Sequence, residues 1–256
     1  MPAIALTKER TLPTPVAGLT AIGSCQPAWI PGVIWRGSQD SLRSHKPAAH
    51  LEAAPLGSGL REDLDHHALH VCVDMQKLFA PGSPWHVPWT MDVLPAVTDI
   101  ARRHPARTLF TRFIPARKAG GGPGVWRKYY EKWSQVTLER EGAALVELHP
   151  ALSELVPPAR VLDKHVYSPW TEGGMDQLLG GTGIDTLIVT GGETDVCVLA
   201  TVLGGIDRGY RVIVVSDALC SSADRQHHAL LTLYRERFSE QVEVTTVAEV
   251  IERWRP

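Results

Sequence analysis

The 256-residue sequence has few cysteines, no long apolar run and almost no excess of charge of either sign. Its four cysteines are Cys25, Cys72, Cys197 and Cys220, and none belongs to a C-x-x-C pair. This spacing does not match the common zinc-binding patterns, and a disulfide framework is not expected in a chain of this size. We therefore expect reduced thiols and a cytoplasmic location. No apolar run approaches the roughly 20 residues of a membrane-spanning helix.

The charge balance excludes another group of functions. The formal net charge is −2, so we expect no nucleic-acid or membrane partner. The glycine-rich segment 119–124 lacks the Gly-Lys-Ser/Thr ending of a phosphate loop, and Gly191-Gly192 does not complete a dinucleotide fingerprint. We therefore expect no bound cofactor.

The chain divides into two parts by composition. Residues 1–66 are rich in Pro, Gly, Ser and Ala and show little periodicity, which predicts an irregular N-terminal extension, at least partly disordered. Covering a pocket and mediating assembly are alternative roles for it. Residues 67–256 form the predicted catalytic domain.

Within that domain, short apolar runs alternate with amphipathic segments. Strands are predicted over 69–74, 107–113, 160–168, 184–191, 211–215 and 241–246. Helices are predicted over 91–104, 126–133, 175–183, 195–210, 222–238 and 247–254. The alternation indicates parallel β-α units, and therefore an α/β fold whose sheet is covered on both faces.

Three reactive side chains fall where predicted strands end. Asp74 ends the first strand, Lys164 lies in the third, and Cys197 follows the fourth after two glycines. The carboxyl ends of parallel strands lie at one edge of a sheet, where ligands bind. The sequence thus predicts an acid, a base and a thiol in one site.

Cys197 has two interpretations. Most isolated cysteines are small buried hydrophobic residues. Cys197 also falls in the first turn of a predicted helix, where the helix dipole and a nearby ammonium favour the thiolate. Together with Asp74 and Lys164, this position favours a nucleophile.

The segments VCVDMQKLF, VLDKHVYSPW and VTGGETDVCVLATVLGGIDRGYRVIVVSDA resemble the isochorismatase-like cysteine hydrolase superfamily, whose members include N-carbamoylsarcosine amidohydrolases, nicotinamidases and ureidoacrylate hydrolases. The similarity runs from about residue 70 to the C-terminus. It implies a three-layer α/β/α sandwich with a mostly parallel, six-stranded, doubly wound sheet. It also implies a homo-oligomer.

The resemblance implies roles for matching residues. Cys197 is the expected nucleophile, Asp74 the general acid/base and Lys164 their electrostatic partner. A cis peptide bond is expected between Gly192 and Glu193, with an oxyanion hole formed by the N–H groups of Glu193 and Cys197. The implied reaction passes through a thioester.

Positions at which the sequence differs from the family pattern narrow the range of expected reactions and substrates. Segment 111–118, TRFIPARK, has no histidine of a nicotinamidase metal motif, so no metal is expected. Cys197 favours hydrolysis of a C–N bond in a small amide, carbamoyl or ureido compound. The alternatives are hydrolysis of an ester or vinyl ether, and a non-catalytic metabolite-binding protein. Glu193 is unusual for the family, and we expect its side chain to face solvent.

Substrate contacts are predicted from aromatic residues in the loops, which often line pockets. The candidates are Phe79, Trp85, Trp126 and Trp170. Positions in the core or a subunit interface are the alternative for each. Arg112 and Arg127 are candidates for binding a carboxylate, with an exposed surface position favoured for both.

Overall fold

The computed structural model describes residues 59–255. Nearly all of the predicted N-terminal extension, 1–66, therefore lies outside the described residues. From residue 59 onward, Leu60 and Leu64 are already buried, and Leu64 bridges to Trp254 near the C-terminus. No helix among residues 59–255 is long and apolar enough to cross a membrane.

Six parallel strands form one sheet. They are β1 (Ala68–Val73), β2 (Thr108–Phe113), β3 (Arg160–Lys164), β4 (Thr186–Gly192), β5 (Arg211–Cys220) and β6 (Val242–Thr245). Their order is β3-β2-β1-β4-β5-β6, and every neighbouring pair is parallel. The predicted parallel α/β sheet is confirmed.

The strand sequences explain why both faces of the sheet are covered. In β1, Ala68 and Cys72 belong to one buried cluster, whereas Leu69 and Val71 belong to the other. Successive side chains of a strand point to opposite faces, so a strand that is buried at every position needs a layer on each side.

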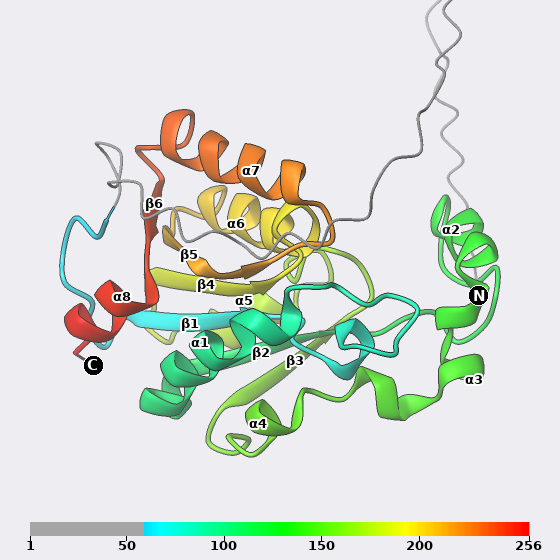
Figure 1. Ribbon diagram of the computed structural model, residues 1–256. Coiled ribbons are helices and arrows are strands. Elements are labelled where there is room, and N and C mark those ends of the chain that lie inside the picture. The colour runs from blue at the N-terminus through cyan, green and yellow to red at the C-terminus, as the bar shows by residue number, and fades with distance from the viewer. Residues whose placement is uncertain (1–58, 256) are drawn as a thin grey trace, which may run out of the picture. The chain divides into compact units, whose positions relative to one another are not determined.

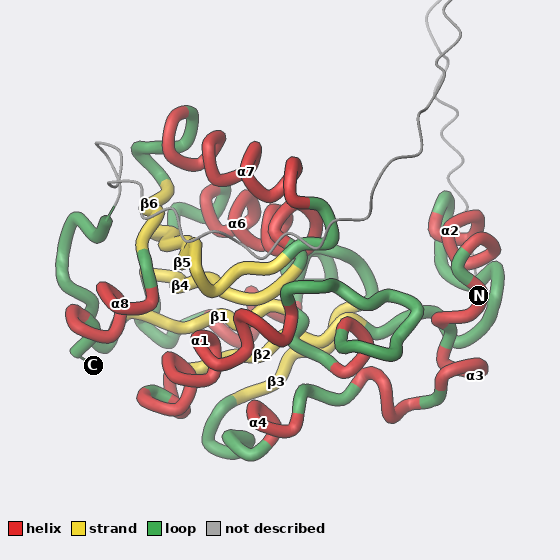
Figure 2. Tube along the Cα trace, viewed as in Figure 1, coloured by secondary structure: helices red, strands yellow, loops and turns green. Residues whose placement is uncertain are grey.

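Helices supply those layers. The α-helices are α1 (Thr90–Arg103), α2 (Trp126–Lys132), α3 (Leu138–Glu141), α4 (Pro150–Ser153), α5 (Gly174–Leu179), α6 (Leu199–Ile206), α7 (Asp224–Glu236) and α8 (Val247–Arg253). Helices α1, α4 and α8 pack in the first cluster, and α5, α6 and α7 in the second. Figure 1 shows α6 and α7 on one side of the sheet and α1 and α8 on the other. Figure 2 shows the same arrangement with the long connections that carry α2 and α3. This is the expected three-layer, doubly wound sandwich.

The chain order reverses direction across the sheet between β1 and β4. From β1 the chain proceeds outward to β2 and β3, and later returns to β4 on the other side. A crevice forms at the carboxyl ends of strands at such a switch point. Asp74 follows β1 and Cys197 follows β4, so the fold places both side chains at this crevice.

Gly191 allows β4 to lie close to β1 at this point. Its φ is 99°, a conformation that favours glycine, and a Cβ here would collide with the Val73 carbonyl oxygen. The register between β4 and β5 also shifts between Val189 and Gly191. The glycine therefore has a steric function immediately before the candidate site.

Several element boundaries differ from the sequence prediction. Strand β3 ends at Lys164 rather than at residue 168, and β5 continues to Cys220 rather than ending at 215. The predicted helix 195–210 is a π-helical turn (Thr194–Val198) followed by α6, which ends at Ile206. Residues 207–210 form the turn into β5.

Candidate active site

A buried ion pair lies at the carboxyl edge of the sheet. Lys164 Nζ is 2.6 Å from Asp74 Oδ2, and both side chains are at most 1% exposed. Lys164 ends β3 and Asp74 follows β1, with β2 between the two strands. Burial lowers the pKa of Lys164, but the neighbouring Asp74 and Cys197 outweigh burial and raise it. Lys164 therefore remains a cation in the interior.

Asp74 is held by β2 as well as by Lys164. The Thr111 hydroxyl donates to Asp74 Oδ1 at 2.6 Å, so both carboxylate oxygens have a donor. The backbone of Asp74 has a φ of 52°, in the left-handed region that Asp tolerates better than most residues. Residues in such regions cluster at functional sites when the surrounding structure holds them there.

Cys197 approaches this pair from the other side of the crevice. It lies in the π-helical turn Thr194–Val198, which joins β4 to α6, and its side chain is buried. Single π-helical turns are rare in proteins overall, but those that occur are often found at functional sites. Asp74 and Lys164 are both near enough to shift the pKa of the Cys197 thiol. The structure therefore brings together the three residues predicted from strand ends.

The resting thiol is less acidic than the sequence predicted. Burial raises the pKa of Cys197 well above its ordinary value, and Asp74 raises it further, whereas Lys164 only partly offsets both effects. Lys164 lowers the pKa as predicted, but burial and the neighbouring Asp74 carboxylate, which the prediction omitted, outweigh it. Burial and Asp74 therefore favour the protonated thiol, which has an acceptor carboxylate nearby.

The peptide bond between Gly192 and Glu193 is cis. The Glu193 carbonyl accepts hydrogen bonds from the N–H groups of Val196 and Val198. Cys197 lies between these two donors, and its N–H takes part in neither bond. The Glu193 carbonyl is thus tied to the π-turn that carries Cys197.

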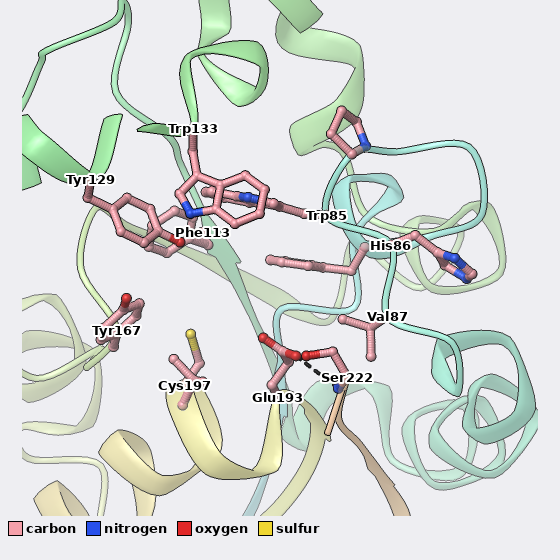
Figure 3. A pocket seen from close by; sticks show the side chains of 13 residues that line it. Trp85, His86, Val87, Phe113, Tyr129, Trp133, Tyr167, Glu193, Cys197 and Ser222 are labelled. Carbon is pink, nitrogen blue, oxygen red and sulfur yellow. Dashed lines mark hydrogen bonds between the residues drawn. The ribbon is translucent and has the colours of Figure 1, made fainter. Parts of the chain in front are cut away.

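A cavity of about 270 Å³ opens over Cys197. Figure 3 shows its lining, with the sulfur and the Glu193 carboxylate at the base and aromatic rings around them. The aromatic lining residues are Phe79, Trp85, Phe113, Tyr129, Trp133 and Tyr167. A concave, mainly aromatic cavity with a few polar groups is the usual form of a small-molecule site.

Two of the four predicted aromatic contacts line this cavity. Phe79 and Trp85 do so, and their rings stack with centroids 6.2 Å apart. Trp126 contacts Tyr129 and Tyr167 but lies outside the lining. Trp170 is buried among the helices of the second cluster, and its indole N–H donates to the Thr201 carbonyl. Trp170 is therefore a core residue in this structure.

Sequence reasoning missed several lining residues. Tyr129 and Trp133 belong to the irregular connection between β2 and β3, and Tyr167 follows β3 in the segment predicted as strand. The spacing of Tyr129 and Trp133, four residues apart around helix α2, was an available signal.

The orientation of the Glu193 side chain also differs from the prediction. Its side chain is half-buried and lines the cavity instead of facing solvent. The Ser222 N–H donates to Glu193 Oε1 at 2.9 Å, which holds the carboxylate against the start of the β5–α7 connection.

The two arginines considered for binding a carboxylate lie away from the cavity. Arg112 makes two hydrogen bonds to the Asp163 carboxylate, and neither Arg112 nor Arg127 lines the cavity. Among the described residues, one group has donor atoms close enough for a metal ion, namely Asp65, His66 and His67. It precedes β1, at the opposite edge of the sheet from Asp74.

Comparison with known proteins agrees with this architecture. The family model of the Isochorismatase domain matches residues 68–249. The chain is 26% identical over 176 residues to ureidoacrylate amidohydrolase RutB of Methylorubrum extorquens, covering 58% of this chain and 67% of that protein. It is 26% identical over 163 residues to maleamate amidohydrolase of Pseudomonas putida, covering 61% and 73%. A cysteine hydrolase from Pseudomonas syringae superposes with a TM-score of 0.63 at 31% identity, covering 73% of this chain and 92% of that structure.

Proposed function

Because the chain belongs to the isochorismatase family of hydrolases, we propose that it is a metal-independent cysteine hydrolase that cleaves a C–N bond of a small amide, carbamoyl or ureido compound. The observation that carries this proposal is the position of the Cys197 thiol at the base of a cavity, near enough to the buried Asp74–Lys164 pair for both charges to shift its pKa. The amidohydrolase names of the two curated relatives support the choice of a C–N bond.

The first half of the proposed reaction uses the resting protonation states. As Cys197 Sγ attacks the substrate carbonyl carbon, the thiol proton passes to the Asp74 carboxylate. This order suits a thiol whose pKa is raised, because no free thiolate is needed beforehand. The N–H groups of Glu193 and Cys197 stabilise the negative charge on the carbonyl oxygen.

The second half regenerates the enzyme. Asp74 returns the proton to the departing nitrogen, the C–N bond breaks, and a thioester to Cys197 remains. Water then attacks the thioester and gives one proton to Asp74. The C–S bond breaks, and Asp74 returns this proton to the sulfur. Lys164 Nζ, 2.6 Å from Asp74 Oδ2, holds the carboxyl group in position through both proton transfers.

The donor groups at the cavity support a mechanism without a metal. The described lining offers one carboxylate, Glu193, one thiol, Cys197, and one imidazole, His86. The His86 ring is exposed and points away from the sulfur in Figure 3. The group of metal-ligand type before β1 is too distant, since a six-residue strand spans about 20 Å.

A screen for ammonia release over carboxamides, carbamoyl compounds and ureido compounds tests this proposal. Cys197→Ala should abolish turnover and keep the fold. Cys72→Ala is a matched control, because Cys72 is a buried cysteine that packs on the other face of the sheet. Full activity of Cys197→Ala would overturn the mechanism.

A further inference from the structure

The cavity over Cys197 combines an aromatic wall with one carboxylate. Trp85 is central to this wall, with its ring 5.9–6.3 Å from those of Phe113, Tyr129 and Trp133. Phe113 and Tyr167 continue it, with centroids 6.5 Å apart. The six aromatic residues therefore form one connected surface around the space above the thiol.

The charged groups at this cavity include one carboxylate, Glu193, that no cationic side chain balances. Asp74 and Lys164 neutralise each other as a buried pair. Glu193 contributes a second carboxylate, and the described residues that line the cavity include no lysine or arginine. Glu193 Oε1 accepts the Ser222 N–H, whereas Oε2 has no hydrogen-bond partner among residues 59–255. Oε2 is therefore free to accept a donor or a positive charge from a ligand in the cavity.

The electrostatic influence of Glu193 extends over the aromatic wall. Burial raises the pKa of both Tyr129 and Tyr167, and the nearby Glu193 carboxylate contributes to each increase. Both hydroxyls therefore stay neutral, and both rings keep the negative faces that attract cations. Phe113 already has a cation near its ring, since Lys164 Nζ lies 5.1 Å from its centroid.

Aromatic faces together with a carboxylate are the features that bind organic cations. We propose that the preferred substrate carries a small, weakly hydrated organic cation, such as a quaternary ammonium group, beside the bond that Cys197 cleaves. Glu193 and the aromatic wall bind the cation, and the carbonyl carbon then lies at the sulfur. This assignment rests on the proposed hydrolytic function for its chemistry, but not for its binding site.

The same arrangement disfavours anionic substrates. A carboxylate-bearing amide would bring a second negative charge beside Glu193 without an arginine or lysine in the described lining to offset it. Like charges placed together in an interface lower affinity and produce specificity. Glu193 is therefore a specificity-determining residue, through its side chain, in addition to the backbone role of its N–H group.

Binding of two isosteric probes tests the site without any chemical step. Choline carries a trimethylammonium group, and 3,3-dimethylbutan-1-ol has the same shape without the charge. For the unmodified full-length protein, calorimetry should show that choline binds at least about tenfold more tightly. In Glu193→Gln, which can still accept the Ser222 N–H, the two affinities should become similar. Glu252→Gln changes an exposed carboxylate on α8 and should retain the preference.

Turnover of three amides tests the consequence for specificity. Betaine amide is the cationic substrate, 3,3-dimethylbutanamide its neutral isostere and succinamate an anionic amide. The expected order of kcat/KM is cationic, neutral, anionic, and Glu193→Lys should reverse it. Equal affinity of choline and the alcohol for the unmodified protein, or a preference unchanged in Glu193→Gln, would overturn the cation site. Absence of all turnover with the choline preference intact would overturn only the proposed hydrolysis.

Discussion

Lys164 Nζ lies 2.6 Å from Asp74 Oδ2 in a pair that solvent hardly reaches. Two strands, β3 and β1, bring these residues together across β2, whose Thr111 hydroxyl satisfies the other carboxylate oxygen. Buried ion pairs of this kind contribute little net stability, but removal of one partner leaves a buried charge. The pair is therefore better explained by chemistry at Cys197 than by stability.

Lys164→Met should lower the free energy of unfolding by about 3 kcal/mol, because Asp74 would remain buried without its cation. Urea denaturation measures this loss. The double variant Asp74→Asn/Lys164→Met removes both charges and should recover part of the stability. A single variant as stable as the unmodified protein would contradict this account of the pair.

The Cys197 thiol should react slowly with iodoacetamide at pH 7. Burial and Asp74 raise its pKa, so the thiolate appears only at a pH above the value of about 8.5 of an ordinary cysteine. Mass spectrometry of the alkylated protein across pH 6–10 measures the midpoint. Asp74→Asn should shift the midpoint to lower pH, since it removes a negative neighbour. A midpoint below the ordinary value in the unmodified protein would show an activated thiolate instead.

Stability should fall in acid because of His70. This histidine is fully buried in β1 between Thr108 and Thr190, and burial, with a smaller effect of His104, lowers its pKa to about 3. The unfolded chain binds a proton near pH 6.5, whereas the folded chain does not until about pH 3. The stability contribution of His70 is therefore present above pH 6.5 and is lost as the pH falls below it.

This loss should amount to about 1.4 kcal/mol per pH unit between those two values. Urea unfolding at pH 7, 6 and 5 measures the slope. His70→Gln keeps hydrogen-bonding capacity toward Thr108 and Thr190 but has no titrating group. The free energy of unfolding of this variant should therefore change less with pH, by the amount that one proton contributes. Equal slopes in both proteins would exclude His70 as the cause.

Trp85→Ala should raise KM by at least about tenfold, because Trp85 contacts four other aromatic residues of the cavity wall. Trp170→Phe is the matched control. It removes the hydrogen bond to the Thr201 carbonyl, so it should cost about 1 kcal/mol of stability and leave KM unchanged. A raised KM in Trp170→Phe with an unchanged KM in Trp85→Ala would show instead that Trp170 contacts the substrate.

The sheet and the reactive residues at its edge could be predicted from the sequence. Apolar runs separated by amphipathic segments specify parallel strands covered on both faces, and the carboxyl ends of such strands share one edge. For that reason the positions of Asp74, Lys164 and Cys197 along the chain were enough to predict that they meet. The family motifs around them added the expected cis bond and the roles.

Which residues line the cavity, and how its charges act on Cys197, could not be predicted from the sequence because both depend on contacts made in the folded chain. In irregular connections no periodicity states which way a side chain points, so Tyr129 and Trp133 were missed while Trp170 was assigned to the substrate. The direction of the Cys197 pKa shift depends on burial and on the nearby Asp74 carboxylate, which local helix geometry does not contain. Glu193 faces the cavity because the Ser222 N–H, 29 residues further along the chain, holds its carboxylate there.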